Sequence, residues 1–485
     1  MAVSLPKSLD PIVASLQSEG LGAQILAPTD ADYTARVDSY WSSSARFRPA
    51  CILQPKSTAE VSSAIKALVA AGQSFAVRSG GHTNWAGSNN IEGGVTLDLG
   101  CLNSITVSPD RKTADIGPGL RWKDVYDELH KSKLIVAGGR EGNVGVAGLL
   151  LGGGYTFFTG RYGFGCDNVV AYEVILADGS IVTADAESNA DLFRALKGGS
   201  NNFGVVTKFT MKTIQSDRVW GGLTFYPKQA IPQAIDALTS FVNGISDDPD
   251  SNLVCIITYI PEFKDIVVST LFNQVEGIEA PPVYDKWRAI PQIMNTIKMT
   301  TIAEMAHEYN VPANYHAIWF TACFNNDSRI ITKSSELHDQ LVEEIKQMAP
   351  DGDFITQCLW QPLPKVYSEH SVKAGGNVMG VERQPHDGLL LLATAMMKTP
   401  EQEAAVYPKV KSWVDEVKAY AASIDGNLEW TYLNYADSSQ DVLASYGAEN
   451  LKKMRAVAAK YDPDQVFQKL CPGGFKLSKV AFPES

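Results

Sequence analysis

A short apolar strand runs into a glycine turn at Ser74-Phe-Ala-Val-Arg-Ser-Gly-Gly-His-Thr-Asn-Trp-Ala-Gly87. Glycines let the backbone turn sharply, and successive N–H groups in such a turn form a concave site for an anion. Arg78 adds a positive charge beside the turn. The stretch predicts a phosphate cradle with His82 at its lip, and a tight turn that holds one satisfied histidine explains the same residues equally well.

The residues before this turn predict a β-α-β unit that places the turn at the end of a strand. Cys51-Ile-Leu-Gln54 is typical of a strand, and Ser57-Thr-Ala-Glu60 is a capping box that starts a helix. Apolar residues at helical spacing follow, and Gly72 is well placed to end the helix. Because α/β proteins usually bind ligands where strands end, the unit favours a binding site at the turn.

Two more glycine-rich segments follow in the chain. They read Gly138-Gly-Arg-Glu-Gly-Asn-Val-Gly-Val-Ala-Gly-Leu-Leu-Leu-Gly-Gly-Gly-Tyr155 and Leu196-Lys-Gly-Gly-Ser-Asn-Asn-Phe-Gly-Val-Val206. A nicotinamide-binding Rossmann unit is excluded, because the required spacing of strand, glycines, helix and downstream acid is absent. Glycines at this density allow the backbone to approach a flat ring closely.

Together, the three segments resemble the FAD-binding domain of the vanillyl-alcohol-oxidase superfamily, in its berberine-bridge-enzyme-like and 6-hydroxy-nicotine-oxidase-like branch. The resemblance covers nearly the whole chain. It implies an α+β fold with a two-subdomain FAD-binding domain of the PCMH type over residues 1–215. An α+β substrate domain with an antiparallel sheet is expected over 216–435. A C-terminal segment, 436–485, is expected to return to the FAD domain.

The resemblance also implies how the flavin is held. His82 is expected to carry a covalent bond to the 8α carbon of the flavin. Relatives with a doubly attached flavin have a cysteine before a matching Val-Gly-Val, whereas residues 139–143 contain none. We therefore expect attachment through His82 only. The residues expected to bind FAD are Arg78, Ser79, Gly80, Gly81, His82, Ser88, Gly142, Asn143, Val144, Gly148, Gly153, Val206 and Asn434.

The second half alternates β-rich runs with long helices, which is typical of an α+β domain. If Glu429-Trp-Thr-Tyr-Leu-Asn-Tyr435 is a strand, Tyr432 and Asn434 share one face. The segment resembles the active-site Tyr-x-Asn-Tyr of the family, which implies that Tyr432 removes a proton from the substrate hydroxyl. A nearby cation or the flavin must then lower its pKa from about 10. The alternative is an aromatic strand that only packs on the sheet.

Other residues of the second half are weaker candidates. Glu382, His386 and Asp387 lie in a proline-broken polar loop that is either a source of bases or, as we favour, a solvated loop. Trp360 and Gln361 are expected to line the substrate pocket, because Pro362 should end their strand.

Composition limits the kinds of partner. The 485 residues carry a formal net charge of -12, which argues against nucleic acid or an anionic membrane as the main partner. No run approaches the ~20 apolar residues of a membrane span. The seven scattered cysteines form no Cys-x-x-Cys pair, and no signal peptide is evident. These observations predict an intracellular, cytoplasmic protein with free thiols.

The sequence therefore predicts an FAD-dependent oxidase or dehydrogenase. It would move a hydride from a small organic molecule, typically a secondary metabolite, to covalently bound flavin, with O2 as acceptor. Three alternatives stay open: a flavin-containing isomerase or cyclase without net redox turnover, a carbohydrate oxidase, and a non-catalytic flavin-binding protein. The oligomeric state is not predicted.

Overall fold

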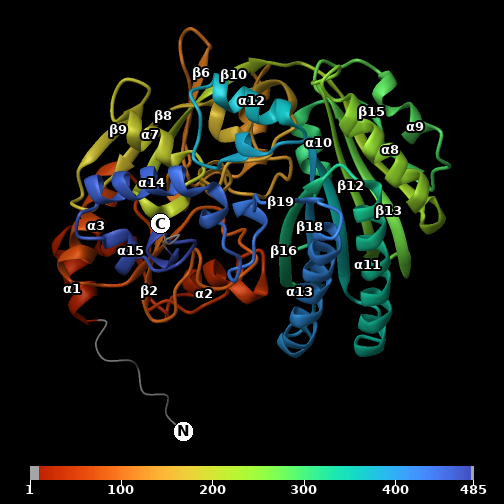
Figure 1. Ribbon diagram of the computed structural model, residues 1–485. Helices are drawn as coiled ribbons and strands as arrows, with labels where there is room; N and C mark the ends of the chain where they lie inside the picture. Colours follow the sequence, from red (N-terminus) through yellow and green to blue (C-terminus); the bar gives the residue numbers. More distant parts are fainter. Residues whose placement is uncertain (1–9, 482–485) are drawn as a thin grey trace.

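A computed structural model describes residues 10–481 of the chain as three β-sheets surrounded by helices (Figure 1). The predicted α+β class is confirmed. From the sequence we expect a short helix near residues 9–17. The structure has α1 (Asp10–Ser18), and Leu9 lies outside the described residues. No helix in residues 10–481 combines the length and the apolar character that a membrane crossing needs.

A small four-stranded sheet carries the glycine turn. Its strands lie in the order β1 (Ile25–Leu26), β2 (Cys51–Leu53), β4 (Val95–Asp98) and β3 (Phe75–Arg78). Both β2 and β3 run parallel to β4, and α3 (Thr58–Ala70) connects them, so the predicted β-α-β unit is confirmed. The predicted cap is also present, because Ser57 accepts a hydrogen bond of 3.2 Å from the backbone N–H of Glu60. The turn starts where β3 ends.

A six-stranded sheet completes the first half of the chain. All of its pairs are antiparallel. Its strands are β5 (Ile105–Val107), β6 (Thr113–Ile116), β10 (Val205–Gln215), β8 (Val169–Ile175) and β9 (Ile181–Asp185), with β7 (Leu134–Val136) beside β10. Helices of this half are α2 (Ala31–Asp38), α4 (Trp122–His130), α5 (Val146–Leu151), α6 (Thr159–Tyr162) and α7 (Ala190–Leu196).

The second half is built on a nine-stranded antiparallel sheet. Its strands are β14 (Met294–Asn295), β11 (Val219–Pro227), β13 (Asp265–Gln274), β12 (Ser251–Ile260), β17 (Ile355–Leu363), β18 (Gly388–Met397), β16 (His316–Asn325) and β19 (Asn427–Leu428), with β15 (Lys298–Thr300) beside β11.

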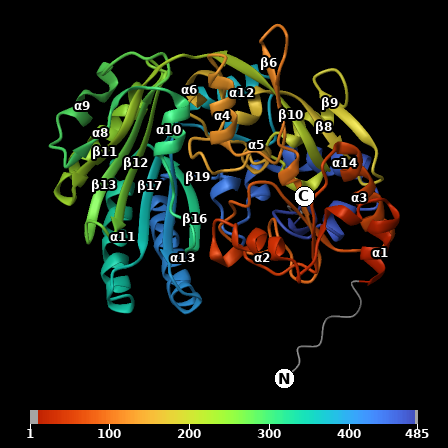
Figure 2. The same ribbon diagram turned by 180° about the vertical axis from the view of Figure 1, so that it is seen from behind.

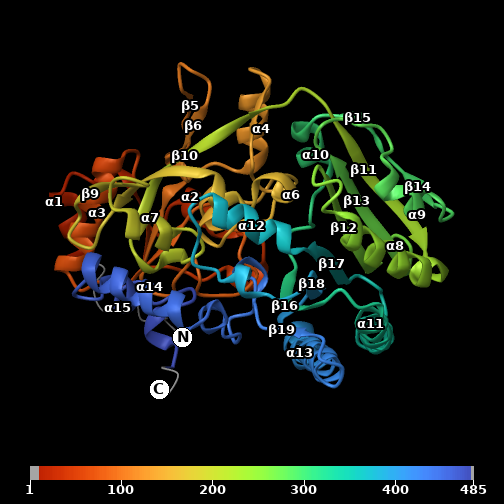
Figure 3. The same cartoon turned by 45° about the horizontal axis from the view of Figure 1, so that its top comes forward.

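The three long helices of this half cover one face of this sheet. The covering helices are α8 (Ile231–Gly244), α11 (Ser328–Met348) and α13 (Pro400–Ala422), and Figure 3 shows the sheet between them and the first half. The opposite face is left to line a space between the two halves, as an antiparallel sheet permits. Shorter helices are α9 (Asp285–Arg288), α10 (Ile302–Glu308) and α12 (Lys365–Lys373).

The C-terminal segment, blue in Figure 2, packs on the first half. Its helix α14 (Ala448–Tyr461) contacts α7 through Lys460 and Asp191, and α15 (Val466–Lys469) shares a hydrophobic cluster with α3. Phe467 meets Phe75 edge to face, with ring centroids 6.4 Å apart. From the sequence we expect one helix over 442–461, but Gly447 adopts a φ of +91° and separates a short 3₁₀ turn from α14. Such a φ favours glycine and breaks the helical path.

Buried His338 gives the fold a predictable pH dependence. It lies on α11, where its Nε2 is 2.7 Å from the hydroxyl of Thr356 and its ring stacks on Trp413. Burial lowers its pKa from 6.5 to about 3. The unfolded chain therefore binds a proton that the folded chain does not, and stability falls as the pH drops from 6.5 towards 3, by up to about 1.4 kcal/mol per pH unit.

We expect His338→Gln to flatten this slope while it keeps a hydrogen-bonding group near Thr356. Chemical denaturation at a series of pH values measures the slope. The matched control is His386→Gln, which changes a histidine on an exposed loop. A slope in His338→Gln that equals the wild-type slope would show that another group carries the acid sensitivity.

Candidate active site

A cavity of about 270 Å³ lies between the two halves. The glycine turn, the loop before α5 and the start of β10 contribute to one side. The open face of the nine-stranded sheet and the 3₁₀ turn at Leu433–Tyr435 contribute to the other. The C-terminal residues Phe467, Cys471, Gly474 and Phe475 close one end.

Glycines let two backbone segments touch at the cavity wall. A Cβ on Gly145 would lie 2.5 Å from the backbone nitrogen of Gly80, and a Cβ on Gly80 would lie 2.5 Å from the Cα of Gly145. No side chain fits at either position without moving the backbone. Arg121 holds the pair together, because its guanidinium donates to the carbonyl of Gly80 at 2.7 Å and to that of Asn143.

His82 sits in a fixed position at the cavity. Its ring stacks on Trp41, with centroids 4.7 Å apart and an interplanar angle of 13°. Its Nε2 lies 3.4 Å from Oε2 of Glu141, and neither of these two buried atoms has a hydrogen-bond partner in the described part of the chain. The second carboxylate oxygen of Glu141 accepts from Asn143 at 3.1 Å. The unsatisfied pair indicates that the site is built around a further group.

These residues fit an FAD molecule. A flat ring needs the close backbone approach that Gly80 and Gly145 provide, and the lining offers polar partners at Ser88, Ser200 and Asn201. Ten of the predicted site residues line the cavity: Ser79, Gly80, Gly81, His82, Ser88, Val144, Gly148, Val206, Tyr432 and Asn434.

Arg78 does not lie in the cavity, contrary to expectation. Its fully buried guanidinium lies 3.7 Å from the centroid of the Tyr40 ring and donates to the carbonyl of Arg36 at 2.6 Å and to Ser39 at 2.8 Å. A Cβ on Gly81 would lie 2.9 Å from this guanidinium. Arg78 thus supports the turn from beneath and brings no charge to the cavity lining.

Gly142, Asn143 and Gly153 also lie outside the lining. A Cβ on Gly142 would meet the carbonyl of Ala306 at 2.3 Å, and a Cβ on Gly153 would meet the sulfur of Met379 at 2.4 Å. These two glycines therefore serve chain packing. The side chain of Asn143 donates to Glu141 and to Asn310, so it holds the loop in place.

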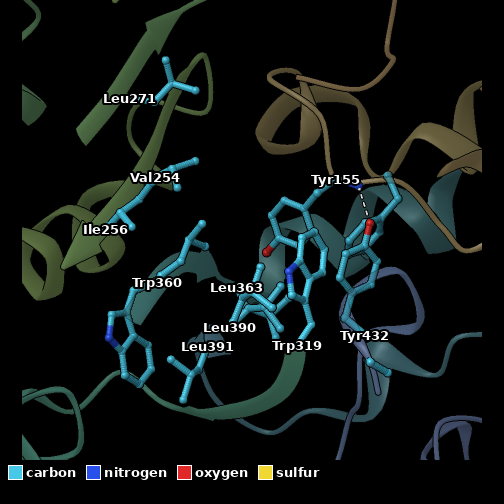
Figure 4. Packing of buried hydrophobic residues seen from close by; sticks show 14 of the residues in the cluster. Tyr155, Val254, Ile256, Leu271, Trp319, Trp360, Leu363, Leu390, Leu391 and Tyr432 are labelled. Atoms are coloured by element: carbon cyan, nitrogen blue, oxygen red, sulfur yellow. Dashed lines mark hydrogen bonds between the residues drawn. The ribbon is translucent and has the colours of Figure 1, made fainter. Parts of the chain in front are cut away.

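The segment that holds Tyr432 is not the strand we expected. Only β19 before it pairs with the sheet, and Leu433–Tyr435 forms a 3₁₀ turn. Tyr432 and Asn434 nevertheless meet, because Asn434 donates to the Tyr432 hydroxyl at 3.1 Å and to the carbonyl of Leu149 at 3.0 Å. The backbone N–H of Tyr155 also donates to this hydroxyl at 2.9 Å (Figure 4).

Burial raises the pKa of Tyr432 above its ordinary value. Arg140 lowers the pKa, but as one of the smaller contributions. A base that works near neutral pH needs the opposite shift. The cation that the sequence argument required is therefore present, and burial outweighs it.

The open sheet face supplies an apolar wall. Side chains alternate across β17, so Gln357 and Leu359 face the cavity. Gln361 follows the same alternation and joins a polar cluster with Arg140 and Tyr435. Trp360 points to the helix-covered face instead, where it donates to Cys358 at 3.2 Å; in Figure 4 its ring lies apart from Tyr155, Trp319 and Tyr432.

Two other expectations are corrected or supported. Pro362 does not end its strand, since β17 continues to Leu363. Pairing with β12 stops at Trp360, so the missing N–H of Pro362 costs no hydrogen bond on that side.

Glu382, His386 and Asp387 are exposed and absent from the cavity lining, as a solvated loop should be.

Several cavity residues were not predicted from the sequence. They are the adjacent charged residues Arg140 and Glu141, the tyrosines Tyr309 and Tyr435, and the C-terminal residues named above. Trp41, which stacks on His82 from outside the lining, was not predicted either. Two signals were available: charged residues inside a glycine-rich segment, and the Cys-Pro-Gly-Gly-Phe run at 471–475. Among the described cysteines only Cys471 reaches the lining, where Asn201 lies 3.8 Å from its sulfur and burial raises its thiol pKa.

Known proteins resemble the chain over nearly its full length. The model of the FAD binding domain matches residues 49–185. The FAD-dependent monooxygenase drtC of Aspergillus calidoustus is 35% identical over 97% of this chain and 91% of its own length. The bifunctional solanapyrone synthase of Alternaria solani is 32% identical over 93% of this chain and 86% of its own.

Solved structures share the fold at lower identity. The 6-hydroxy-D-nicotine oxidase of Arthrobacter nicotinovorans superposes with a TM-score of 0.76, at 20% identity, over 98% of this chain and 99% of its own. The glucooligosaccharide oxidase of Acremonium strictum superposes with a TM-score of 0.76, at 19% identity, over 98% of this chain and 100% of its own.

Proposed function

Because this chain belongs to the FAD-linked oxidoreductases of the vanillyl-alcohol-oxidase superfamily, we propose that it is an oxidase that holds FAD covalently through His82 alone. It oxidises a small, largely apolar organic molecule of secondary metabolism and passes the electrons to O2. The observation that carries the proposal is the position of His82, stacked on Trp41 beside the glycine cradle with its Nε2 facing Glu141.

The orientation of His82 supports a single linkage through its other nitrogen. The glucooligosaccharide oxidase of Acremonium strictum is described as carrying a 6-S-cysteinyl, 8α-N1-histidyl FAD. In the present chain Nε2 faces Glu141, which leaves Nδ1, the N1 position, for the bond to the 8α carbon. The loop Gly139–Asn143 holds no cysteine that would add a second bond.

When bound, the flavin supplies the hydride acceptor. The chain must then hold the substrate and take its proton, and we propose Tyr435 for this task in place of Tyr432. The Tyr435 hydroxyl accepts from Gln361 at 2.9 Å and from the guanidinium of Arg140 at 3.4 Å. These two donors fix the position of the Tyr435 oxygen at the cavity, and reach to the substrate is the first requirement of a general base.

Exchanging each tyrosine for phenylalanine separates the two assignments. We expect Tyr435→Phe to slow flavin reduction by roughly 10²- to 10⁴-fold, as loss of a general base does. Tyr432→Phe is the matched control, because it removes a buried hydroxyl of the same size from the same cavity. Anaerobic mixing with an active substrate gives the rate. A larger loss in Tyr432→Phe than in Tyr435→Phe would restore Tyr432 as the base.

The reaction type is tested by following flavin colour and O2 together. Candidate alcohols, amines and acids are mixed with the FAD-loaded protein without O2, and an oxidase substrate bleaches the flavin until O2 restores the colour and forms H2O2. Incorporation of labelled oxygen into the product would instead identify a monooxygenase, the activity named for several relatives. Turnover with neither bleaching nor O2 uptake would identify an isomerase or cyclase.

The lining argues against a carbohydrate oxidase. Val254, Leu359, Leu392 and Trp319 present apolar surface to the cavity from β12, β17, β18 and β16. A sugar needs a dense set of polar partners for its hydroxyls, and such a wall would leave many of them unpaired. The same wall suits an aromatic or aliphatic body.

A further inference from the structure

A buried guanidinium lies at the cavity beside the nine-stranded sheet. Arg140 is 8% exposed and lines the cavity, in the loop between β7 and α5. One of its terminal nitrogens, Nη2, donates to the side-chain oxygen of Gln361 and to the Tyr435 hydroxyl. The guanidinium carbon of Arg140, Cζ, lies 5.3 Å from the centroid of the Tyr155 ring. The second terminal nitrogen, Nη1, is buried and has no hydrogen-bond partner among residues 10–481.

No carboxylate neutralises this charge. Within residues 10–481, no Asp or Glu oxygen lies within the 4.0 Å of an ion pair with Arg140. Glu141 is next in the chain, but its carboxylate faces His82 and Asn143. Buried charges are normally paired, because an unpaired one loses its hydration without compensation. Gln361 and Tyr435 offer Arg140 only neutral oxygens.

Arg140 keeps one donor free for a ligand. The Tyr435 oxygen already accepts from Gln361 and from Nη2 of Arg140, and its remaining lone pair is the one that the proposed base uses for the substrate proton. Arg140 lines the cavity beside Tyr435 and Tyr309. Nη1 of Arg140 is therefore the charged donor that is left for a negatively charged oxygen of the ligand.

We propose that Arg140 selects substrates that carry a carboxylate or an ionised enol, attached to an apolar body that packs on the open sheet face. This inference rests on the proposed function and adds the class of substrate. Although the whole chain carries a net charge of -12, a local guanidinium in a water-poor cavity outweighs repulsion at long range.

A pair of probes of nearly equal shape tests the charge requirement. Calorimetry measures the binding of cinnamate, an aromatic carboxylate, and of cinnamamide, its neutral amide, to the FAD-loaded protein. We expect the carboxylate to bind at least about tenfold more tightly, which is the usual worth of a charge-assisted hydrogen bond. Equal binding of the two probes would overturn the proposal. Two further aromatic carboxylates, benzoate and phenylacetate, are measured in the same way, and failure of all three carboxylates to bind would also overturn it.

Variants then assign the preference to Arg140. Arg140→Gln should remove the preference for the carboxylate. Arg140→Lys should retain part of it, because lysine keeps the positive charge but lacks the planar guanidinium with its fixed set of N–H donors. The matched control is Arg218→Gln, which changes an exposed arginine. A carboxylate preference that survives in Arg140→Gln would contradict the assignment. The wild-type comparison needs no variant, so it stands even if Arg140→Gln does not fold.

Two measurements on the same samples distinguish a failure of this inference from a failure of the proposed function. FAD content is measured on each preparation before calorimetry, and O2 uptake is measured in parallel. Absence of FAD from wild-type protein supplied with FAD would contradict the proposed function. Bound FAD and O2 uptake combined with indifference to the charge of the probe would contradict only the substrate class.

Discussion

His82→Ala is expected to give a polypeptide that is colourless after denaturation, whereas the wild-type chain stays yellow. The ring nitrogen of His82 is the only proposed point of attachment, so its removal abolishes the covalent fraction completely. The glycine cradle of Gly80 and Gly145 is untouched, so we expect FAD to remain bound non-covalently in the folded variant. Absorbance of the acid-precipitated chain and of the supernatant gives the two fractions.

Folding of this variant needs its own control, because His82 packs on Trp41. Thermal unfolding with and without FAD shows whether the cavity survives, and His386→Ala alters an exposed histidine as the matched comparison. A His82→Ala chain that keeps its yellow colour through denaturation would place the linkage elsewhere, with Cys471 as the cavity cysteine to examine first.

Gly145→Ala is expected to have the second largest effect. The new methyl group would lie 2.5 Å from the nitrogen and 2.6 Å from the Cα of Gly80, and backbone atoms cannot rotate away. Forced repacking of this kind costs about 1–3 kcal/mol of stability. The displaced turn also carries His82, so we expect loss of both FAD binding and attachment. FAD content and chemical denaturation measure the two effects.

Gly244→Ala provides the comparison for this prediction. Gly244 ends α8, and a Cβ there would meet only one side-chain carbon, at an ordinary 4.0 Å. Its stability and FAD content should match the wild type within error. A Gly145→Ala protein with wild-type FAD content would show that the contact between the two glycine segments does not shape the cofactor site.

Features set by neighbouring residues could be predicted from the sequence. The cap at Ser57, the helix after it and the strand before the glycine turn depend on spacing within a few residues, and all were found. The location of the cavity followed from three glycine-rich segments, because backbone segments that approach closely need small residues at fixed places.

Contacts between distant parts of the chain could not be predicted in this way. Arg78 was assigned to the cavity by its place in the motif, but its long side chain reaches Tyr40 beneath the turn. Arg140 meets Gln361 across 221 residues of sequence, and no local pattern records that pair. Tyr432 lies in an aromatic run that favours a strand. Its ring nevertheless packs on Trp430 and Tyr435, and the chain forms a 3₁₀ turn at Leu433–Tyr435.

The mass of the denatured wild-type chain is the most direct test of the account. The protein is expressed with ample FAD, unfolded, freed of small molecules and weighed, and its peptides are then mapped. We predict the added mass of one FAD on the peptide that contains His82 and on no other. A chain without added mass, or with FAD on a cysteine, would contradict the proposed attachment through His82 alone.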